Sequence, residues 1–153
     1  MSFLRSLGVW VAICAATIVF GLPAIPLGLL PPRGEWFLRL ARGWARVILA
    51  ASGVSVRIVH PERLSADRSF VIAPNHESFY DIPLLFAVLP MSVRFLAKRS
   101  LFRLPILGWS MAAAGFLPVD RKDRSRSRGL VDEALRRLKG GTSLIVFPEE
   151  TRT

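Results

Sequence analysis

Hydrophobic positions divide the chain into a long apolar start and a series of shorter runs. No charged side chain occurs between residues 6 and 32. The stretch Met1–Leu22 predicts a helix that could cross most of a bilayer core, because about 20 residues suffice for that. Four prolines are expected to end it: Pro23, Pro26, Pro31 and Pro32. We interpret the stretch as a retained anchor or a helix dipping into one leaflet, with a cleavable signal peptide as the alternative.

A second helix is predicted over Glu35–Ala51, where apolar and basic positions take opposite sides. The apolar positions follow helical spacing: Phe37, Leu40, Trp44, Val47, Ile48 and Ala51. The other side carries Arg39, Arg42 and Arg46. Such a helix suits the headgroup region of a membrane, although an ordinary amphipathic helix packed on a sheet would show the same pattern. Residues 1–51 are therefore expected to form a membrane-associated helical segment.

From Ser52 onward the pattern is that of an α/β domain, which we place at residues 52–153. Five strands are predicted: Val54–Val59, Phe70–Ala73, Val93–Ala97, Phe116–Val119 and Ser143–Phe147. Three helices are predicted between them: Ile82–Leu89, Trp109–Ala114 and Ser125–Lys139.

His76 and Asp81 lie five positions apart, directly after the second predicted strand. Five steps turn roughly 140° around a helix, and an odd separation in a strand sends side chains to opposite faces. The two can meet only across a turn, where they would form an imidazole–carboxylate pair suited to general-base chemistry. The alternatives are structural. Asp81 could be a helix N-cap before Pro83 or, with Ser78, part of a capping box, and the histidine could be a structural residue.

Other polar residues fall at or just beyond the carboxyl ends of predicted strands. With His76 they form four groups: His76, Lys98, Asp120–Arg121 and Glu149–Arg152. Open α/β sheets place their ligands at that edge. We therefore expect these groups to share one site.

Charge and hydropathy together narrow the class of partner. Within 153 residues, which suffice for one domain, 21 Lys and Arg face 11 Asp and Glu, and the net charge is +10. Such a balance favours anionic partners, but 52% of residues are hydrophobic and the mean hydropathy is +0.41. A membrane surface therefore fits better than nucleic acid, since no aromatic row interleaves with the basic run at 121–128.

The cysteine and histidine counts bear on redox state and metal binding. Cys14 is the single cysteine, so no internal disulfide can form. With two histidines and no convincing third ligand beside His76 and Asp81, the sequence argues against a zinc site. Only Arg5 precedes the apolar segment and several arginines follow it, which puts the later chain on the cytoplasmic side.

Three ordered blocks carry a resemblance to a known family. Asn75–Asp81 matches N-H-x-x-x-x-D, and Phe147–Arg152 resembles F-P-E-G-T-R. Between them lies a second block: Lys98–Leu101, Pro105, Gly108, Gly115 and Phe116–Arg121. These blocks resemble the glycerolipid acyltransferases, the family of lysophosphatidic acid acyltransferases. The chain departs from that pattern at Ser100 and Glu150, where the family has glutamate and glycine, and it stops directly after the third block, so we expect a C-terminally incomplete domain.

The resemblance implies a mixed sheet flanked by helices and a direct acyl transfer from acyl-CoA or acyl carrier protein to lysophosphatidic acid. His76 would act as the base and Asp81 would orient it. Substrate binding would fall to Lys98, Arg121, Glu149 and Arg152. No cofactor, metal or nucleic acid is expected. The expected location is the inner membrane, among membrane phospholipids and the lysophospholipid acceptor. The alternatives are transfer to another lysolipid, or a catalytically impaired homologue that binds lipid at the membrane surface.

Overall fold

The structure, a computed structural model, describes residues 3–30, 35–120 and 127–148. Its longer helices are α1 (Phe3–Leu29), α2 (Glu35–Ser52), α3 (Asp81–Val88), α4 (Leu107–Ala113) and α5 (Ser127–Lys139). Two 3-10 helices, η1 (Pro61–Arg63) and η2 (Arg99–Arg103), were not expected from the sequence. The strands are β1 (Val71–Ile72), β2 (Val93–Lys98), β3 (Leu117–Val119) and β4 (Ser143–Ile145).

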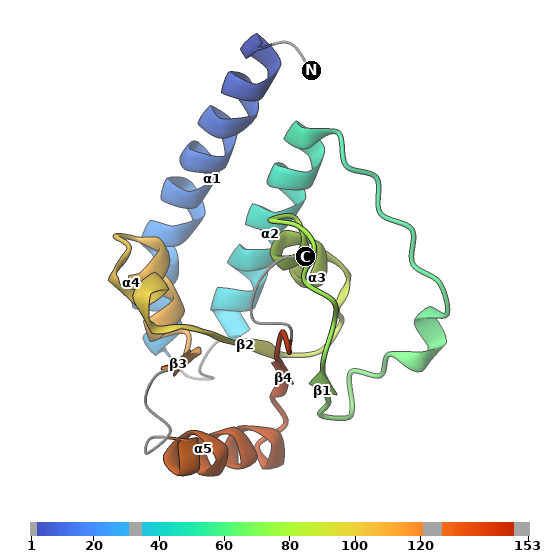
Figure 1. The fold of residues 1–153 in the computed structure, drawn as a ribbon, viewed down its shortest axis with the longest axis vertical. Coiled ribbons are helices and arrows are strands. Elements are labelled where there is room, and N and C mark those ends of the chain that lie inside the picture. Colours follow the sequence, from blue (N-terminus) through green and yellow to red (C-terminus); the bar gives the residue numbers. More distant parts are fainter. Residues whose placement is uncertain (1–2, 31–34, 121–126, 149–153) are drawn as a thin grey trace.

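The four described strands form one sheet in the order β1-β4-β2-β3, with every pair parallel (Figure 1). The α/β class with flanking helices is confirmed, but the described sheet is parallel where we expected a mixed one. Parallel strands place all their carboxyl ends at one edge, so the segments that follow β1, β2, β3 and β4 emerge together.

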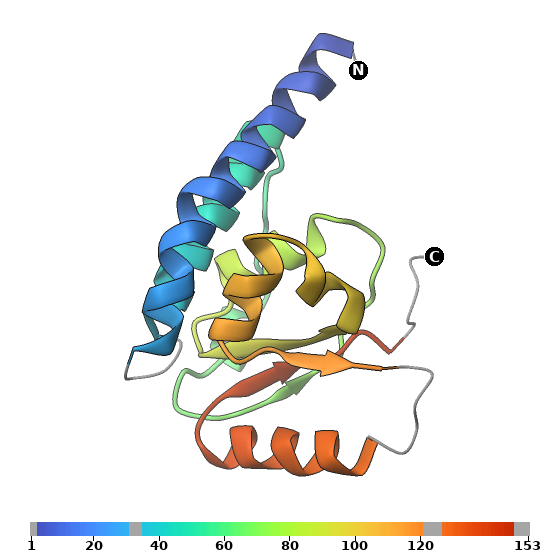
Figure 2. The ribbon, with the colours of Figure 1, turned by 90° about the vertical axis from the view of Figure 1, so that its left-hand side faces the viewer.

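Helices cover both faces of the sheet (Figure 2). Helix α5 lies across one face, while α3 and α4 lie on the other. Helix α2 packs on α3, and α1 packs on both α2 and α4. The two N-terminal helices therefore form an additional layer on the α3–α4 side.

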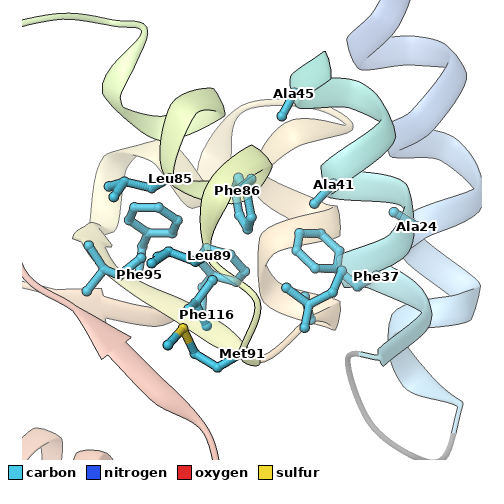
Figure 3. Packing of buried hydrophobic residues seen from close by; sticks show 14 residues of the cluster. Ala24, Phe37, Ala41, Ala45, Leu85, Phe86, Leu89, Met91, Phe95 and Phe116 are labelled. Atoms are coloured by element: carbon cyan, nitrogen blue, oxygen red, sulfur yellow. The ribbon is translucent and has the colours of Figure 1, made fainter. Parts of the chain in front are cut away.

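The hydrophobic core lies between the sheet and the helices on the α3–α4 side, and α2 contributes to it (Figure 3). Its centre is aromatic: Phe37 of α2 meets Phe86 of α3 and Phe116 edge-on, with ring centroids 6.2 and 5.4 Å apart. Phe95 of β2 stacks on Phe116 at 5.8 Å. Burying each of these side chains contributes about 1.5–3 kcal/mol. Helix α2 is thus part of the same core as the sheet.

Helix α1 runs through Pro23 and Pro26, so the expectation that prolines end the helix at Leu22 was wrong for these two. A proline inside a helix removes one hydrogen bond and crowds the preceding turn, at about 3 kcal/mol. Tertiary packing offsets this loss, since Ala24 and Gly28 are buried around those prolines. Pro31 and Pro32 lie outside the described residues.

A strained turn fixes α4 against α1. Ile106 has φ +61° and ψ −62°, and Leu107 N–H donates to the Pro105 carbonyl at 2.6 Å, which is a γ-turn of the rare positive-φ form. The Ile106 side chain packs on Gly21 so closely that a Cβ at residue 21 would lie 2.6 Å from Ile106 Cγ2. Further along α1, a Cβ on Gly28 would meet the Ala113 backbone at 3.0 Å. The two helices therefore approach at glycines.

Helix α2 is packed more deeply than its pattern suggested. Its buried residues include Leu38, Ala41, Ala45 and Leu49, whereas Val47 is 42% exposed. Arg42 does not share the solvent side with Arg39 and Arg46. Its guanidinium donates to the carbonyls of Leu89 at 3.0 Å and Pro90 at 2.8 Å, where α3 ends. For the buried face of α2, the structure thus agrees with the alternative of an amphipathic helix packed on the rest of the domain.

The strand expected at Val54–Val59 does not form. The segment has no strand partner in the described part of the chain, and Val56, Ile58 and Val59 are exposed. Alternation shows that residues suit a pleated surface, but a strand also needs a neighbour to receive its hydrogen bonds.

Candidate active site

The loop between β1 and α3 brings His76 and Asp81 together. The distance from His76 Nδ1 to Asp81 Oδ2 is 2.8 Å, and the two side chains are 20% and 22% exposed. The backbone reverses at Ser78, whose carbonyl accepts from Asp81 N–H at 3.3 Å, and α3 begins at Asp81. The turn that the five-residue spacing requires is present.

A single carboxylate oxygen organises the whole loop. Besides the imidazole, Asp81 Oδ2 accepts from the backbone N–H groups of Glu77 and Ser78, both at 3.0 Å. The capping box considered for Ser78 and Asp81 does not form: Tyr80 is the N-cap of α3, and the Ser78 hydroxyl accepts from Tyr80 N–H at 3.2 Å. Asp81 is the first residue of α3 and not its N-cap. The structural and the orienting roles therefore coexist in one side chain.

This arrangement defines which ring nitrogen can react. An ionised carboxylate only accepts hydrogen bonds, so the partner nitrogen Nδ1 carries the proton. Nε2 is then the nitrogen that can accept a proton from a substrate, and the nearby negative charge stabilises the resulting imidazolium.

An apolar cavity of about 1060 Å³ opens beside His76. Helices α1 to α4 contribute to its wall, together with β2 and the segment that follows β4. Lining residues include Phe20, Trp44, Phe86, Leu104 and Phe147. Its volume is at the upper end of ordinary ligand pockets, about 300–1,000 Å³. A long apolar group can therefore be bound with one end at the histidine.

Among the described residues that line this cavity, Lys98 is the one lysine or arginine. It ends β2, next to Val119 of β3. Asp120 follows β3 and approaches Arg99, with 3.5 Å between Oδ2 and Nε. The structure thus brings His76, Asp81 and Lys98 to one edge of the sheet. The other three predicted site residues, Arg121, Glu149 and Arg152, lie outside the described residues.

Comparison with known proteins identifies the family. A family model described as "Acyltransferase" matches residues 55–153. The chain belongs to this family. Two curated relatives are each 33% identical. The first is a chloroplastic 1-acyl-sn-glycerol-3-phosphate acyltransferase of Arabidopsis thaliana, over 80% of this chain and 34% of that protein. The second is a lyso-ornithine lipid O-acyltransferase of Pseudomonas aeruginosa, over 75% of this chain and 42% of that protein.

The acyltransferase fold is confirmed by a solved structure. The crystal structure of the 1-acyl-sn-glycerophosphate acyltransferase of Thermotoga maritima superposes with a TM-score of 0.78 and 24% identity. The match covers 98% of this chain and 61% of that one. The chain spans about a third of the length of the first curated relatives that it matches.

Two features of this acyltransferase site have no signal in the local sequence. Phe147 lies against the imidazole of His76 with ring centroids 4.2 Å apart, although 71 positions separate the two residues in the printed sequence. Trp44 of α2 donates from Nε1 to the Thr17 hydroxyl of α1 at 3.1 Å, inside the wall of the cavity. Both contacts join distant segments, so only the fold reveals them.

No group of three metal-binding side chains occurs within residues 3–30, 35–120 and 127–148. Cys14 is exposed on α1.

Proposed function

We propose that the chain is an O-acyltransferase that moves a fatty acyl group from a thioester to the free hydroxyl of lysophosphatidic acid, giving phosphatidic acid. Acyl-CoA and acyl carrier protein are the candidate donors. One observation supports this best: the His76–Asp81 pair, joined at 2.8 Å, lies on an apolar cavity large enough for an acyl chain. Family membership agrees with it.

The proposed reaction needs only the residues present and the two substrates. His76 Nε2 takes the proton from the acceptor hydroxyl as its oxygen attacks the thioester carbonyl carbon. The C–S bond then breaks, and the thiolate leaves with the proton that His76 returns. The carboxylate of Asp81 holds the ring and stabilises its charged form during the step. General-base help of this kind contributes about 10²–10⁴ in rate.

We assign the acyl chain and the acceptor phosphate to different parts of the site. The acyl chain lies among the apolar side chains of α1 to α4, where burial removes about 0.8 kcal/mol of unfavourable hydration per methylene. We assign Lys98, which lines the cavity, to the acceptor phosphate. From their places in the sequence blocks we also assign Arg121 and Arg152 to the phosphate, and Glu149 to positioning an arginine or a glycerol hydroxyl.

A second acceptor class has specific support. The relative from Pseudomonas aeruginosa acts, by its name, on a lyso-ornithine lipid, and its identity to this chain equals that of the Arabidopsis relative. A lyso-aminolipid has the same free hydroxyl for His76 to deprotonate and lacks the phosphate monoester. A requirement for Lys98 would therefore separate the two acceptors.

For the N-terminal helices we propose membrane association, with residues 1–51 as the membrane-associated segment of a domain that continues through 52–153. By length and composition, α1 could cross a bilayer. Its exposed side chains include Phe3, Leu4, Leu7, Trp10, Val11 and Val19. The inner membrane, with the sheet on its cytoplasmic side, is the proposed location.

The test is acyl transfer by the purified chain, with labelled acyl-CoA or acyl carrier protein and with lysophosphatidic acid or a lyso-ornithine lipid. His76→Ala should lower turnover by about 10²-fold or more and leave the fold intact. His60→Ala is the matched control, because His60 is an exposed histidine paired with Glu62 and away from the cavity. Undiminished turnover in His76→Ala would rule out the base, and lipid binding without any turnover by the wild type would favour a non-catalytic role.

A further inference from the structure

Four aromatic rings form a column from the core to the candidate base. Phe116 and Phe95 stack at 5.8 Å with their planes 11° apart, and Phe95 and Phe147 follow at 6.1 Å and 19°. Phe147 then meets the imidazole of His76 at 4.2 Å and 30°. Phe95 and Phe116 are only 3% and 6% exposed. The outer two rings are thereby connected to the buried core.

The hydrogen bond to Asp81 constrains one kind of movement of the imidazole. The bond from Nδ1 to Oδ2 fixes the position of one edge of the ring, but it does not itself resist rocking about the line that joins these atoms. Rocking displaces Nε2, which is at the opposite side of the ring. A flat side chain against the ring face resists this rocking, and Phe147 supplies such a contact.

We propose that Phe147 is a positioning residue for His76: it fixes the plane of the imidazole, as Asp81 fixes its edge. The inference rests on the proposed role of His76 as base. The tilted ring contact between Phe147 and His76, at 4.2 Å and 30°, is favourable beyond the burial of area. The next ring, Phe95, stacks on Phe147 and supports it. The hydrophobic core thus sets the direction in which Nε2 points.

Three variants separate this role from simple core packing. Phe147→Leu keeps an apolar side chain and removes the flat ring, while Phe147→Tyr restores the ring. Phe70→Leu is the matched control, because Phe70 is also a half-buried phenylalanine packed on the core but does not line the cavity.

We expect Phe147→Leu to lower kcat by about tenfold or more, because small misplacements of a reacting group are costly. The KM for the acceptor should change by less than about twofold, since Phe147 is not among the charged residues that we assign to the acceptor phosphate. Phe147→Tyr should recover most of kcat. Phe70→Leu should lower stability to a similar degree as Phe147→Leu and leave kcat close to wild type. If Phe147→Leu behaves as Phe70→Leu does, the positioning role is overturned.

A spectroscopic readout decides the same question without turnover. The chain has two histidines, so selective histidine labelling gives two sets of NMR signals, with His60 as the internal reference. In the wild type, the His76 ring protons should be shifted upfield by Phe147, and the Nδ1 proton bonded to Asp81 should exchange slowly with water. Phe147→Leu should broaden that proton signal, and Phe147→Tyr and Phe70→Leu should retain it.

The two proposals fail in different ways. A His76→Ala variant that retains turnover ends the base assignment, whatever the NMR shows. An Nδ1 proton that is equally protected in Phe147→Leu and wild type ends the positioning role, even if His76 is essential.

Discussion

Replacing Asp81 by asparagine removes the charge from the loop between β1 and α3 and changes little else. The amide has nearly the same size, and its oxygen can still accept from the backbone N–H groups of Glu77 and Ser78, which lie 3.0 Å from Oδ2. What disappears is the negative charge 2.8 Å from His76 Nδ1. The substitution therefore tests the orienting and charge-stabilising role apart from the structural one.

The size of the effect follows from that distance. Two unit charges 2.8 Å apart interact by about 1.5 kcal/mol at the dielectric of water and by about 6 kcal/mol at an effective dielectric of about 20. Both side chains are about one-fifth exposed, which places the pair between these limits. Since about 1.4 kcal/mol is tenfold in rate, kcat should fall by about 10²-fold, with tenfold as the lower bound. The stability loss should be about 1 kcal/mol, because the loop keeps its acceptor.

The assay is steady-state acyl transfer, accompanied by thermal unfolding of each variant. Asp132→Asn is the control for the chemical change, since Asp132 lies on the exposed side of α5. It should match wild type in both measurements. Full turnover in Asp81→Asn would refute the proposed pair. A loss of turnover that only parallels unfolding would reduce Asp81 to a structural residue of the loop.

Two predictions concern the scaffold. Gly108→Ala should destabilise the protein by about 2 kcal/mol or more, because its Cβ would lie 2.5 Å from the backbone carbonyl of Phe102. Gly129→Ala should stabilise α5 by up to about 1 kcal/mol, because its Cβ would have no neighbour within 4 Å. Equal Tm values for the two variants and the wild type would contradict both predictions. The hydrogen bond from Arg137 holds the pKa of Glu133 below its usual value of 4.5, so this pair stabilises the fold above that pH and is lost as the pH falls through the lowered pKa. Glu133→Gln should therefore remove about 0.5 kcal/mol at pH 7 and none at low pH, as denaturant titrations at both pH values would show.

Several elements were predictable because local pattern and tertiary role agree. Helices α3 and α5 and strand β2 lie within two residues of their expected bounds. The five-residue spacing allowed His76 and Asp81 to meet only across a turn, and it left a purely structural role for either residue open. Lys98 lies at the end of β2, as expected, and its role in substrate binding stays a prediction.

The features that the sequence did not predict share a physical cause. Helix α1 continues past Pro23 because its far half is packed on α4, and no local propensity reports that contact. Arg42 carries the same charge as Arg39, yet it lies opposite the carbonyls at the end of α3. The role of Phe147 depends on a partner 71 positions away in the sequence. In each case the deciding neighbour is distant along the chain.

The hydrogen bond between Trp44 and Thr17 joins α2 to α1 within the cavity wall. Helices α1 and α2 are therefore a structural part of the acyltransferase domain and do more than attach it to a membrane. Deleting residues 1–51 to gain solubility would remove part of the cavity wall and expose Phe86 and Phe95 to water. A more soluble form of this chain is better obtained by substituting the exposed apolar residues of α1 with polar ones than by deleting the helix.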